Sequence, residues 1–359
     1  MGLLAAALTV ATGLGLTGVA DAAVVCGQTI TQSTTLTADV GPCSADGIVV
    51  GADNITLNLN GFRLFGTPAT GDGAGVLVQS RTGVTVTRGT VSDFDGGVVI
   101  LGGGNNTVSY ATARDNIGAS TGHQGIARTK YADGILVQGS SDNKILNNRA
   151  INNGWSSGIG LIPGDSDHPA IPPALTNNNL VQGNIVSNNV ACRAGPFCDN
   201  DGIRVEPRAG SGCLTGTAIC PGPGNRIIGN TVTGNGLDGI ALFGFTTANV
   251  VSDNIVFNNG FNGAVPGDGI RVFGSGNQIL RNSADGNLAS GISVARRQPT
   301  VGSFPATNPN GRNNVITGNR ARGNRGFDLW DSNRNPDCDN NTWKGNGAGT
   351  GLAACTLTP

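Results

Sequence analysis

Short apolar stretches separated by asparagine and glycine run through almost the whole chain. From Asn225 to Phe243, NRIIGNTVTGNGLDGIALF, asparagines recur every five residues, at Asn225, Asn230 and Asn235, with Ile or Val between them. The alternation of apolar and polar positions predicts very short strands, three to a repeat. Asparagine tolerates the left-handed backbone conformation and bonds its own backbone, so each asparagine is expected at a turn.

The same pattern recurs along the chain, and a repeat fixes the architecture before any local assignment. Complete copies begin at Asn143, Asn179, Asn225, Asn249, Asn277 and Asn314, and a weaker copy has Asn106, Ala111 and Asn116. The copies at Asn225 and Asn249 begin 24 residues apart, which fits one coil of three short strands. The 59 glycines disfavour helix. We predict an all-β fold, a single-stranded parallel β-helix of about nine coils with strands stacked at roughly 4.8 Å and asparagines in side-chain ladders.

These repeats resemble the right-handed parallel β-helix repeats of the pectin-lyase-like superfamily. The segment NITLNLNGFRLFG, Asn54 to Gly66, resembles the opening coil of secreted bacterial members. The resemblance implies a right-handed solenoid but leaves the activity open, because this fold hosts many functions. Pectate lyases, polygalacturonases and alginate epimerases of this fold carry signature motifs, and the chain contains no Asn-Thr-Asp, Gly-His-Gly or Asp-Pro-His-Asp. No catalytic residue is therefore transferred by resemblance.

The sequence divides into three parts. Residues 3–19 are apolar and small, and Ala20-Asp21-Ala22 forms an A-x-A cleavage pattern, so residues 1–22 are interpreted as a secretory signal. Residues 23–53 are expected to cap the solenoid, and residues 54–359 to form it. A membrane anchor is the alternative for the first segment, which is barely long enough. We expect a secreted, extracellular protein with no membrane segment after cleavage.

Eight cysteines in an exported chain indicate disulfides. Sequential pairing is expected because distant coils of a solenoid do not meet, and the pairs are Cys26 with Cys43, Cys192 with Cys198, Cys213 with Cys220, and Cys338 with Cys355. The first and last pairs would staple the two ends, where a solenoid exposes strand edges and core. At the C-terminal end, the bulky Phe327, Trp330 and Trp343 are expected to plug the open coil.

Charge is scarce in this chain. Only 13% of residues are charged and the formal net charge is −1, which excludes a nucleic-acid binder with a broad basic surface. A neutral polar exterior suits a cell wall or an extracellular matrix. We therefore expect a monomer whose partner is an extracellular polysaccharide.

Loop insertions flank one strand of the coil, the strand that begins with Gly-Ile. These strands start at Gly134, Gly158, Gly202, Gly239, Gly269 and Gly291. Long loops on both sides of one stacked sheet would build the walls of a groove, and binding residues gather on loops held by a rigid scaffold. By alternation, the outward-facing floor is expected to include Gln138, Arg204, Glu206, Arg271 and two exposed aromatics, Phe243 and Phe273.

Lyase or epimerase chemistry on a uronate polymer needs a cation to neutralise the carboxylate, a base and an acid. The candidate catalytic residues are Arg204, Glu206, Arg271, Lys130, Tyr131 and His123, with the two arginines as the cations. Sugars pack on aromatic faces and arginine matches carboxylates, so the expected substrate-binding residues are Gln138, Phe243, Phe273, Arg208 and Arg296. Glycoside hydrolysis would instead use two carboxylates, Glu206 with Asp201 or Asp238. A solvated charge ladder of Arg204, Glu206 and Arg271 is the structural alternative.

Aspartates stand directly before the Gly-Ile pair at four positions, Asp133, Asp201, Asp238 and Asp268. Calcium takes several oxygen ligands, and Asp199 next to Asp201 would be its best site. Asp-Gly is also a preferred turn pair, and this interpretation is favoured. We therefore expect no metal ion or other cofactor.

The sequence predicts a secreted β-helix protein that binds an acidic polysaccharide in a groove over residues 134–295, and cleaves or epimerises it. The alternative is a non-catalytic extracellular glycan-binding or surface structural β-helix protein. A periplasmic metal-handling β-helix is disfavoured, because the sequence has no cluster of Met, His or Cys ligands.

Overall fold

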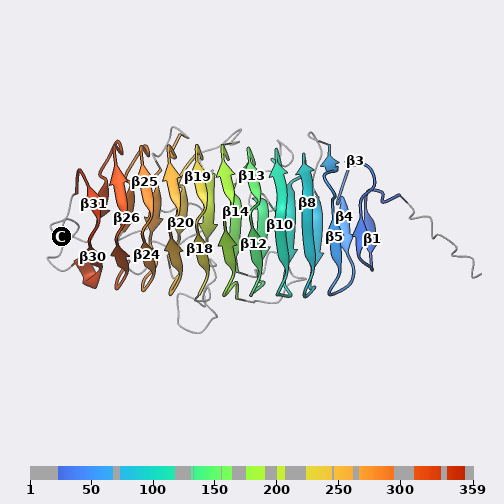
Figure 1. The fold of residues 1–359 in the computed structure, drawn as a ribbon, viewed down its shortest axis with the longest axis horizontal. Coiled ribbons are helices and arrows are strands. Elements are labelled where there is room, and N and C mark those ends of the chain that lie inside the picture. Colours follow the sequence, from blue (N-terminus) through green and yellow to red (C-terminus); the bar gives the residue numbers. More distant parts are fainter. Residues whose placement is uncertain are drawn as a thin grey trace, which may run out of the picture.

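The computed structural model describes residues 23–67, 73–117, 131, 133–154, 156–163, 175–190, 200–206, 224–244, 246–261, 267–294, 311–332 and 338–351. In these residues the chain winds into short strands that stack as three parallel sheets. The coils follow one another along the long axis of the molecule, from the N-terminal to the C-terminal end (Figure 1). The expected parallel β-helix is confirmed.

The Gly-Ile sheet has eleven parallel strands. They are β1 (Gln28–Ile30), β4 (Ile48–Val50), β7 (Ala74–Gln79), β9 (Gly96–Leu101), β11 (Asp133–Gln138), β14 (Ser157–Ile162), β17 (Asp201–Val205), β20 (Ile240–Leu242), β23 (Ile270–Val272), β26 (Ile292–Val294) and β29 (Leu329–Asp331). Nine of these strands lie within residues 54–359, and the other two come from the segment 23–53. The nine strands within residues 54–359 agree with the expected solenoid of about nine coils, and the segment 23–53 adds two strands to the same sheet.

Two further sheets complete each coil. The second sheet contains β2 (Thr34–Thr35), β5 (Thr56–Asn58), β12 (Lys144–Leu146), β15 (Leu180–Gln182), β18 (Arg226–Ile228), β21 (Val250–Ser252), β24 (Gln278–Leu280), β27 (Val315–Thr317) and β30 (Thr342–Lys344). The third contains β3 (Val40–Cys43), β6 (Arg63–Gly66), β13 (Arg149–Ile151), β16 (Ile185–Ser187), β19 (Thr231–Thr233), β22 (Ile255–Phe257), β25 (Ser283–Asp285), β28 (Arg320–Arg322) and β31 (Gly347–Ala348). The longer strands β8 (Thr85–Ser92) and β10 (Thr107–Arg114) turn the corner and pair in both sheets.

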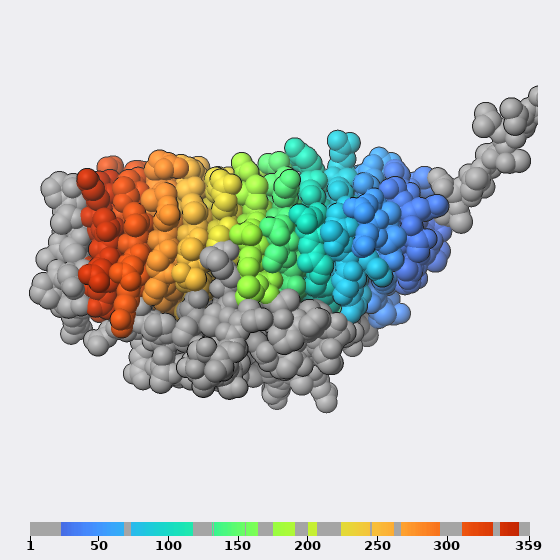
Figure 2. Space-filling model, turned by 90° about the horizontal axis from the view of Figure 1, so that it is seen from below, coloured from blue at the N-terminus to red at the C-terminus, as the bar shows by residue number. Residues whose placement is uncertain are grey.

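The register of the Gly-Ile sheet places equivalent residues of successive repeats side by side. Ile203 pairs with Ile240, and Ile240 with Ile270, and all three side chains are fully buried in one continuous core. Residues dozens of positions apart in sequence thus become neighbours about 4.8 Å apart. Figure 2 shows the coils as successive bands across the surface.

Asparagine ladders hold the turns between the sheets. Asn184 is typical: its backbone amide and its Nδ2 both donate to Asn230 Oδ1, at 2.9 and 3.0 Å, and Nδ2 also donates to the Ile145 carbonyl at 2.8 Å. Each buried side-chain amide therefore satisfies backbone groups that the turn leaves unpaired. The regular spacing of asparagine in the sequence is the cause of the regular coil.

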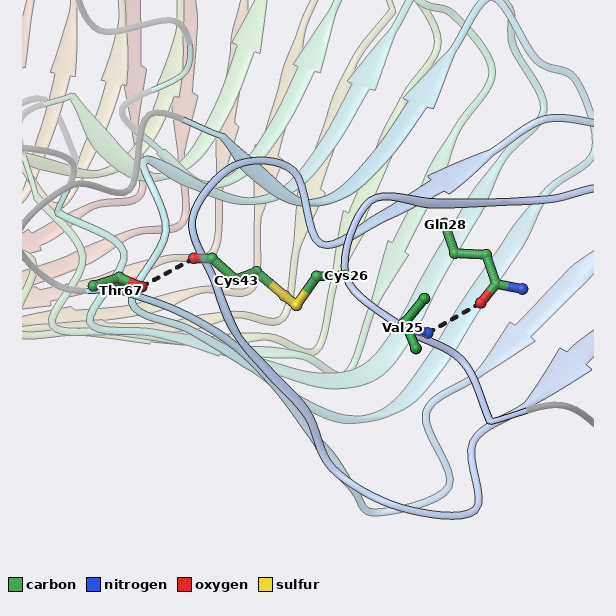
Figure 3. Close-up of a disulfide and its surroundings, with 5 residues drawn as sticks. All are labelled: Val25, Cys26, Gln28, Cys43 and Thr67. Atoms are coloured by element: carbon green, nitrogen blue, oxygen red, sulfur yellow. Dashed lines mark hydrogen bonds between the residues drawn. A yellow bond between two sulfur atoms is a disulfide. The ribbon is translucent and has the colours of Figure 1, made fainter.

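A disulfide closes the N-terminal end. Cys26 and Cys43 are bonded, with their Cα atoms 5.4 Å apart, and Thr67 Oγ1 donates to the Cys43 carbonyl at 3.2 Å (Figure 3). This expected pair is confirmed. Cys338, in the short 3₁₀ turn η1 (Cys338–Asn340), is also disulfide-bonded. The other five cysteines, Cys192, Cys198, Cys213, Cys220 and Cys355, lie outside the described residues.

The three aromatic residues expected to plug the C-terminal end have different positions. Trp343 is buried at 3% exposure in the main core, and its Nε1 donates to Asp331 Oδ2 at 3.0 Å. Phe327 is 37% exposed, and Trp330 lies on the outer face of the Gly-Ile sheet opposite Ser293. Only Trp343 packs into the end of the core as expected, because alternation within β29 directs Leu329 inward and Trp330 outward.

Residues 1–22, which the sequence analysis interprets as a secretory signal, lie outside the described residues. Within the described part of the chain, no helix has the length and apolar character needed to cross a bilayer.

Candidate functional site

The outer face of the Gly-Ile sheet carries the side chains that alternate with the core residues. From β7 to β29 the register aligns one outward column, composed of Leu77, Val99, Leu136, Gly160, Arg204, Ala241, Arg271, Ser293 and Trp330. The apolar residues of its first half pack with Tyr131 into a second apolar cluster. Charged side chains begin at Arg204, so the candidate site lies from the middle of the sheet onward.

Phe243 and Phe273 are buried, with exposures of 5% and 3%, and the prediction that they are exposed is wrong. Their ring centroids lie 5.9 Å apart. The Arg204 guanidinium lies over the Phe243 ring at 4.5 Å, and the Arg271 guanidinium over Phe273 at 5.8 Å. Aromatic faces attract cations, so the phenylalanines position the arginines. Alternation predicts the direction of a side chain but not whether other groups cover it.

Arg204 is almost fully buried, at 3% exposure, and forms an ion pair with Glu206 in the same outward direction. The side chain of Glu206 is 14% exposed. The pair is therefore largely shielded from water, unlike the solvated charge ladder considered from the sequence. Charges interact more strongly in such surroundings than at an open surface.

The aspartates before Gly-Ile are buried and link one coil to the next. Asp201 Oδ1 accepts a hydrogen bond from the Asp238 amide at 2.9 Å, and Asp238 Oδ1 accepts one from the Asp268 amide at 2.7 Å. Asp268 Oδ1 accepts the Ser290 amide at 2.7 Å. These carboxylates therefore close turns as the asparagines do in the ladders, but each adds a buried negative charge.

Arg271 compensates part of this charge. Its Nε donates to Asp268 Oδ2 at 2.7 Å, and its Nη1 lies 3.4 Å from Asp238 Oδ2. Burial alone would lower the pKa of Arg271, but the carboxylates of Asp238 and Asp268 raise it above its ordinary value. Arg271 therefore stays charged at every accessible pH.

Asp133 differs from Asp238 and Asp268, each of which forms an ion pair with Arg271. It is fully buried, and burial raises its pKa to about 6, against the opposing effects of the Ser157 hydroxyl and the Arg204 charge. Ser157 Oγ donates to Asp133 Oδ1, while Oδ2 accepts no hydrogen bond from a described residue. The carboxyl lies over Gly160, where a Cβ would come within 3.0 Å of Asp133 Cγ. Gly160 pairs with Arg204, so the acid and the arginine flank one position on the outer face.

Negative charge exceeds positive charge in this cluster. In its described part, the five carboxylates of Asp133, Asp201, Glu206, Asp238 and Asp268 accompany two arginines, Arg204 and Arg271, which gives −5 + 2 = −3 when all are ionised. A group near pH 6 can hold or release a proton under physiological conditions, which is the property that acid–base catalysis requires. Among the described residues, no group of three or more His, Cys, Asp or Glu side chains is placed to hold a metal ion.

The remaining candidates from the sequence lie on or beside β11 or outside the described residues. Tyr131 lies in the apolar cluster near β9 and β11, and burial, with the charges of Asp46 and Asp95, raises the pKa of its phenol. The phenol therefore stays protonated and is unsuited to act as a base. Gln138 is buried at 6% exposure. His123, Lys130, Arg208, Arg296 and Asp199 lie outside the described residues.

Sequence reasoning assigned Asp133 to a turn and did not propose it as an acid or base. The sequence feature that could have identified it is the residue in the outward column beside each aspartate, in the same coil or the next one. Arg271 belongs to the same coil as Asp268 and to the coil after Asp238, and it forms ion pairs with both. The residue against the Asp133 carboxyl is instead Gly160. Without an arginine in direct contact, burial outweighs the more distant charge of Arg204 and raises the pKa of Asp133.

Several solved structures have a similar fold. The A-module of Azotobacter vinelandii mannuronan C-5 epimerase AlgE4 has a TM-score of 0.58 and 15% identity, with 90% of this chain and 79% of that chain covered. Pectate lyase Pel9A has a TM-score of 0.53 and 16% identity, with 87% and 70% covered. The Dettilon tailspike protein gp208 has a TM-score of 0.50 and 14% identity. The alignment covers 90% of this chain but only 52% of the tailspike. At these identities the similarity shows the fold alone.

No curated protein sequence matches the chain. The family model described as "Right handed beta helix region" matches residues 26–208, which is 183 of 359 residues and more than half of the chain. The matched residues include the first seven strands of the Gly-Ile sheet. This protein therefore belongs to the right-handed β-helix family.

Proposed function

We propose that this protein is a carbohydrate-active enzyme that acts on a uronate polysaccharide at the outer face of the Gly-Ile sheet, by abstracting the proton beside the uronate carboxylate. Similar folds occur in a mannuronan epimerase and a pectate lyase, both of which act on uronate polymers. One observation carries the proposal: Asp133, with a pKa of about 6, flanks the same outward position as Arg204.

The proposed chemistry divides between an acid–base group and a cation. Ionised Asp133 takes the proton from the carbon next to the substrate carboxylate, and Arg204 stabilises the negative charge that develops on that carboxylate. The resulting carbanion then has two fates. Loss of the neighbouring glycosidic oxygen, with formation of a carbon–carbon double bond, is elimination, and return of a proton to the opposite face is epimerisation.

Two features of the site set conditions on this mechanism. Arg204 is already paired with Glu206, so a substrate carboxylate must replace Glu206 as its partner. Both Arg204 and Asp133 are buried, so substrate binding must also expose them. In this mechanism Tyr131 would supply the acid and Arg271 a second cation, and His123 and Lys130 lie outside the described residues.

The excess of carboxylates supports a second candidate, hydrolysis of a glycosidic bond in a neutral glycan. An acid of raised pKa together with an ionised carboxylate is the pair that glycoside hydrolysis uses. Asp133 would be the acid, and Asp201 or Glu206 the second carboxylate. A net negative site would repel a polyanion but accept a neutral sugar chain.

A single assay series separates these activities. The secreted chain is incubated with uronate and neutral polysaccharides, and three products are measured: absorbance of unsaturated sugars, inversion at the uronate carbon by NMR, and new reducing ends. The first identifies a lyase and the second an epimerase, while reducing ends without unsaturation identify a hydrolase. Asp133→Asn should reduce the rate at least a hundredfold. Asp253→Asn is the matched control, because Asp253 lies between the second and third sheets and is 43% exposed.

Binding of a glycan without any of these products would refute the enzyme and leave the non-catalytic binder. Full activity in Asp133→Asn would remove Asp133 from the mechanism while leaving the enzyme class intact.

A further inference from the structure

Access to the outer face is restricted to particular positions. Between β7 and β26, every described member of the outward column defined above is buried except Arg271, whose side chain is 12% exposed. The next accessible member is Trp330, on the last strand of the sheet. Arg271 pairs with Ser293 and Ser293 with Trp330, so the two accessible side chains stand two coils apart, about 10 Å.

The strand that carries Trp330 is held firmly. The Leu329 amide donates to the Thr350 carbonyl at 3.1 Å. Asp328 Oδ2 accepts the amides of Gly349 and Thr350, at 2.9 and 3.1 Å. The side chain of Leu329 is fully buried in the core. An outward indole on such a strand is fixed in place before a ligand binds, which reduces the entropy lost on binding.

The indole of Trp330 has a free polar group as well as an accessible surface. Its Nε1–H is buried and has no hydrogen-bond partner among the described residues. Buried indole N–H groups usually find a partner, and an unsatisfied donor is costly. Trp343, by comparison, donates its N–H to Asp331.

Arg271 offers a charge on the same face. Its Nε and Nη1 face Asp268 and Asp238, and its Nη2 makes no hydrogen bond to a described residue. Guanidinium groups bind carboxylates through such remaining donors. A flat aromatic surface and a cation on one straight column fit a chain of sugar rings that carries carboxylates. The C–H groups of a sugar ring have partial positive charge and pack on the negative face of an aromatic ring.

We propose that Trp330 and Arg271 form a binding subsite for an acidic glycan at the C-terminal end of the outer face, with a sugar ring stacked on Trp330 and a uronate carboxylate at Arg271. This subsite deepens the proposed function and rests on it. It places the polysaccharide over the end of the outward column that carries its two accessible members, Trp330 and Arg271. It also replaces the end-plug role that the sequence predicts for Trp330.

The test measures binding separately from turnover. Uronate oligosaccharides of increasing length are titrated into the full chain by calorimetry and by tryptophan fluorescence, with neutral oligosaccharides of equal length in parallel. Trp330→Ala should weaken binding of the longer uronate oligosaccharides about tenfold. Trp330→Phe should retain most of the affinity, because the ring face remains. Trp343→Phe is the matched control and should bind like the wild type, since Trp343 is buried in the core.

The outcomes distinguish this proposal from the proposed function. Unchanged affinity in a folded Trp330→Ala variant, with the wild type binding uronates, overturns the subsite and leaves the enzyme proposal standing. Equal weakening in Trp330→Ala and Trp343→Phe shows a structural effect and also overturns it. A wild type that binds no glycan removes both proposals. Loss of the fluorescence change in Trp330→Phe, with affinity kept, supports the assignment of the ligand to this ring.

Discussion

The clearest prediction concerns the buried carboxyl of Asp133. Its pKa is about 6 in the folded chain against 3.8 for an unperturbed aspartate. At about 1.4 kcal/mol per pKa unit, ionisation of this group opposes folding by about 3 kcal/mol. Since the folded state holds the proton more tightly than the unfolded state, this contribution lowers stability as pH rises from about 4 to about 6, and the loss is complete above that range.

Replacing Asp133 by Asn removes the charge and keeps the oxygen that accepts the Ser157 hydrogen bond. The free energy of unfolding of the variant minus that of the wild type should therefore increase by about 3 kcal/mol between pH 4 and pH 7. The measurement is urea unfolding of both proteins at a series of pH values. Solenoids can unfold in more than one step, so the comparison uses the same transition in each protein.

Asp253→Asn is the control for this experiment. Hydrogen bonds from Arg281 lower the pKa of Asp253, so its contribution to stability is present at neutral pH and is lost on acidification, with the opposite sign. Its exposure keeps the effect small. Parallel pH profiles for Asp133→Asn and the wild type would show that the carboxyl is not buried in a low-polarity site, and the acid–base role argued from it would fail.

Three further changes test the fold. Asn230→Ala should lower the free energy of unfolding by about 3 kcal/mol in urea. The buried Asn184 amide loses its acceptor, Asn184 Nδ2 loses one of its two acceptors, and the Val181 carbonyl loses a donor. A change below about 1 kcal/mol would contradict the ladder argument. Arg271→Met should lower the free energy of unfolding by about 3–5 kcal/mol, because two buried carboxylates are left uncompensated. Arg281→Met removes an exposed ion pair and should have a much smaller effect, and equal losses in the two variants would refute the distinction. Cys26→Ser should lower the free energy of unfolding by about 3 kcal/mol, because the disulfide joins Cys26 to Cys43 across a sequence separation of 17, and reducing the wild type should cost at least as much, since it also breaks the disulfide of Cys338.

The sequence determined the coil itself. Asparagines at five-residue spacing can satisfy the turn only by bonding the next coil, so their periodicity required parallel stacking, as seen for Asn184 and Asn230. The alternation around Ile203, Ile240 and Ile270 likewise fixed which side chains enter the core. Both features are local, and a local pattern repeated at a constant interval leaves little freedom for the tertiary structure.

Tertiary structure decided the environment of the outward side chains. Alternation placed Phe243 and Phe273 on the outer face, but only the packing across coils shows that they are buried beneath arginines. Trp330 was expected at the C-terminal end of the core, and only the structure shows that it lies on the outer face with a partly accessible side chain. The same holds for Asp133, whose raised pKa depends on a glycine in the next coil and on burial, neither of which its own neighbours in sequence reveal. Burial and ion pairing arise between residues that only stacking brings together, so they are properties of the folded chain.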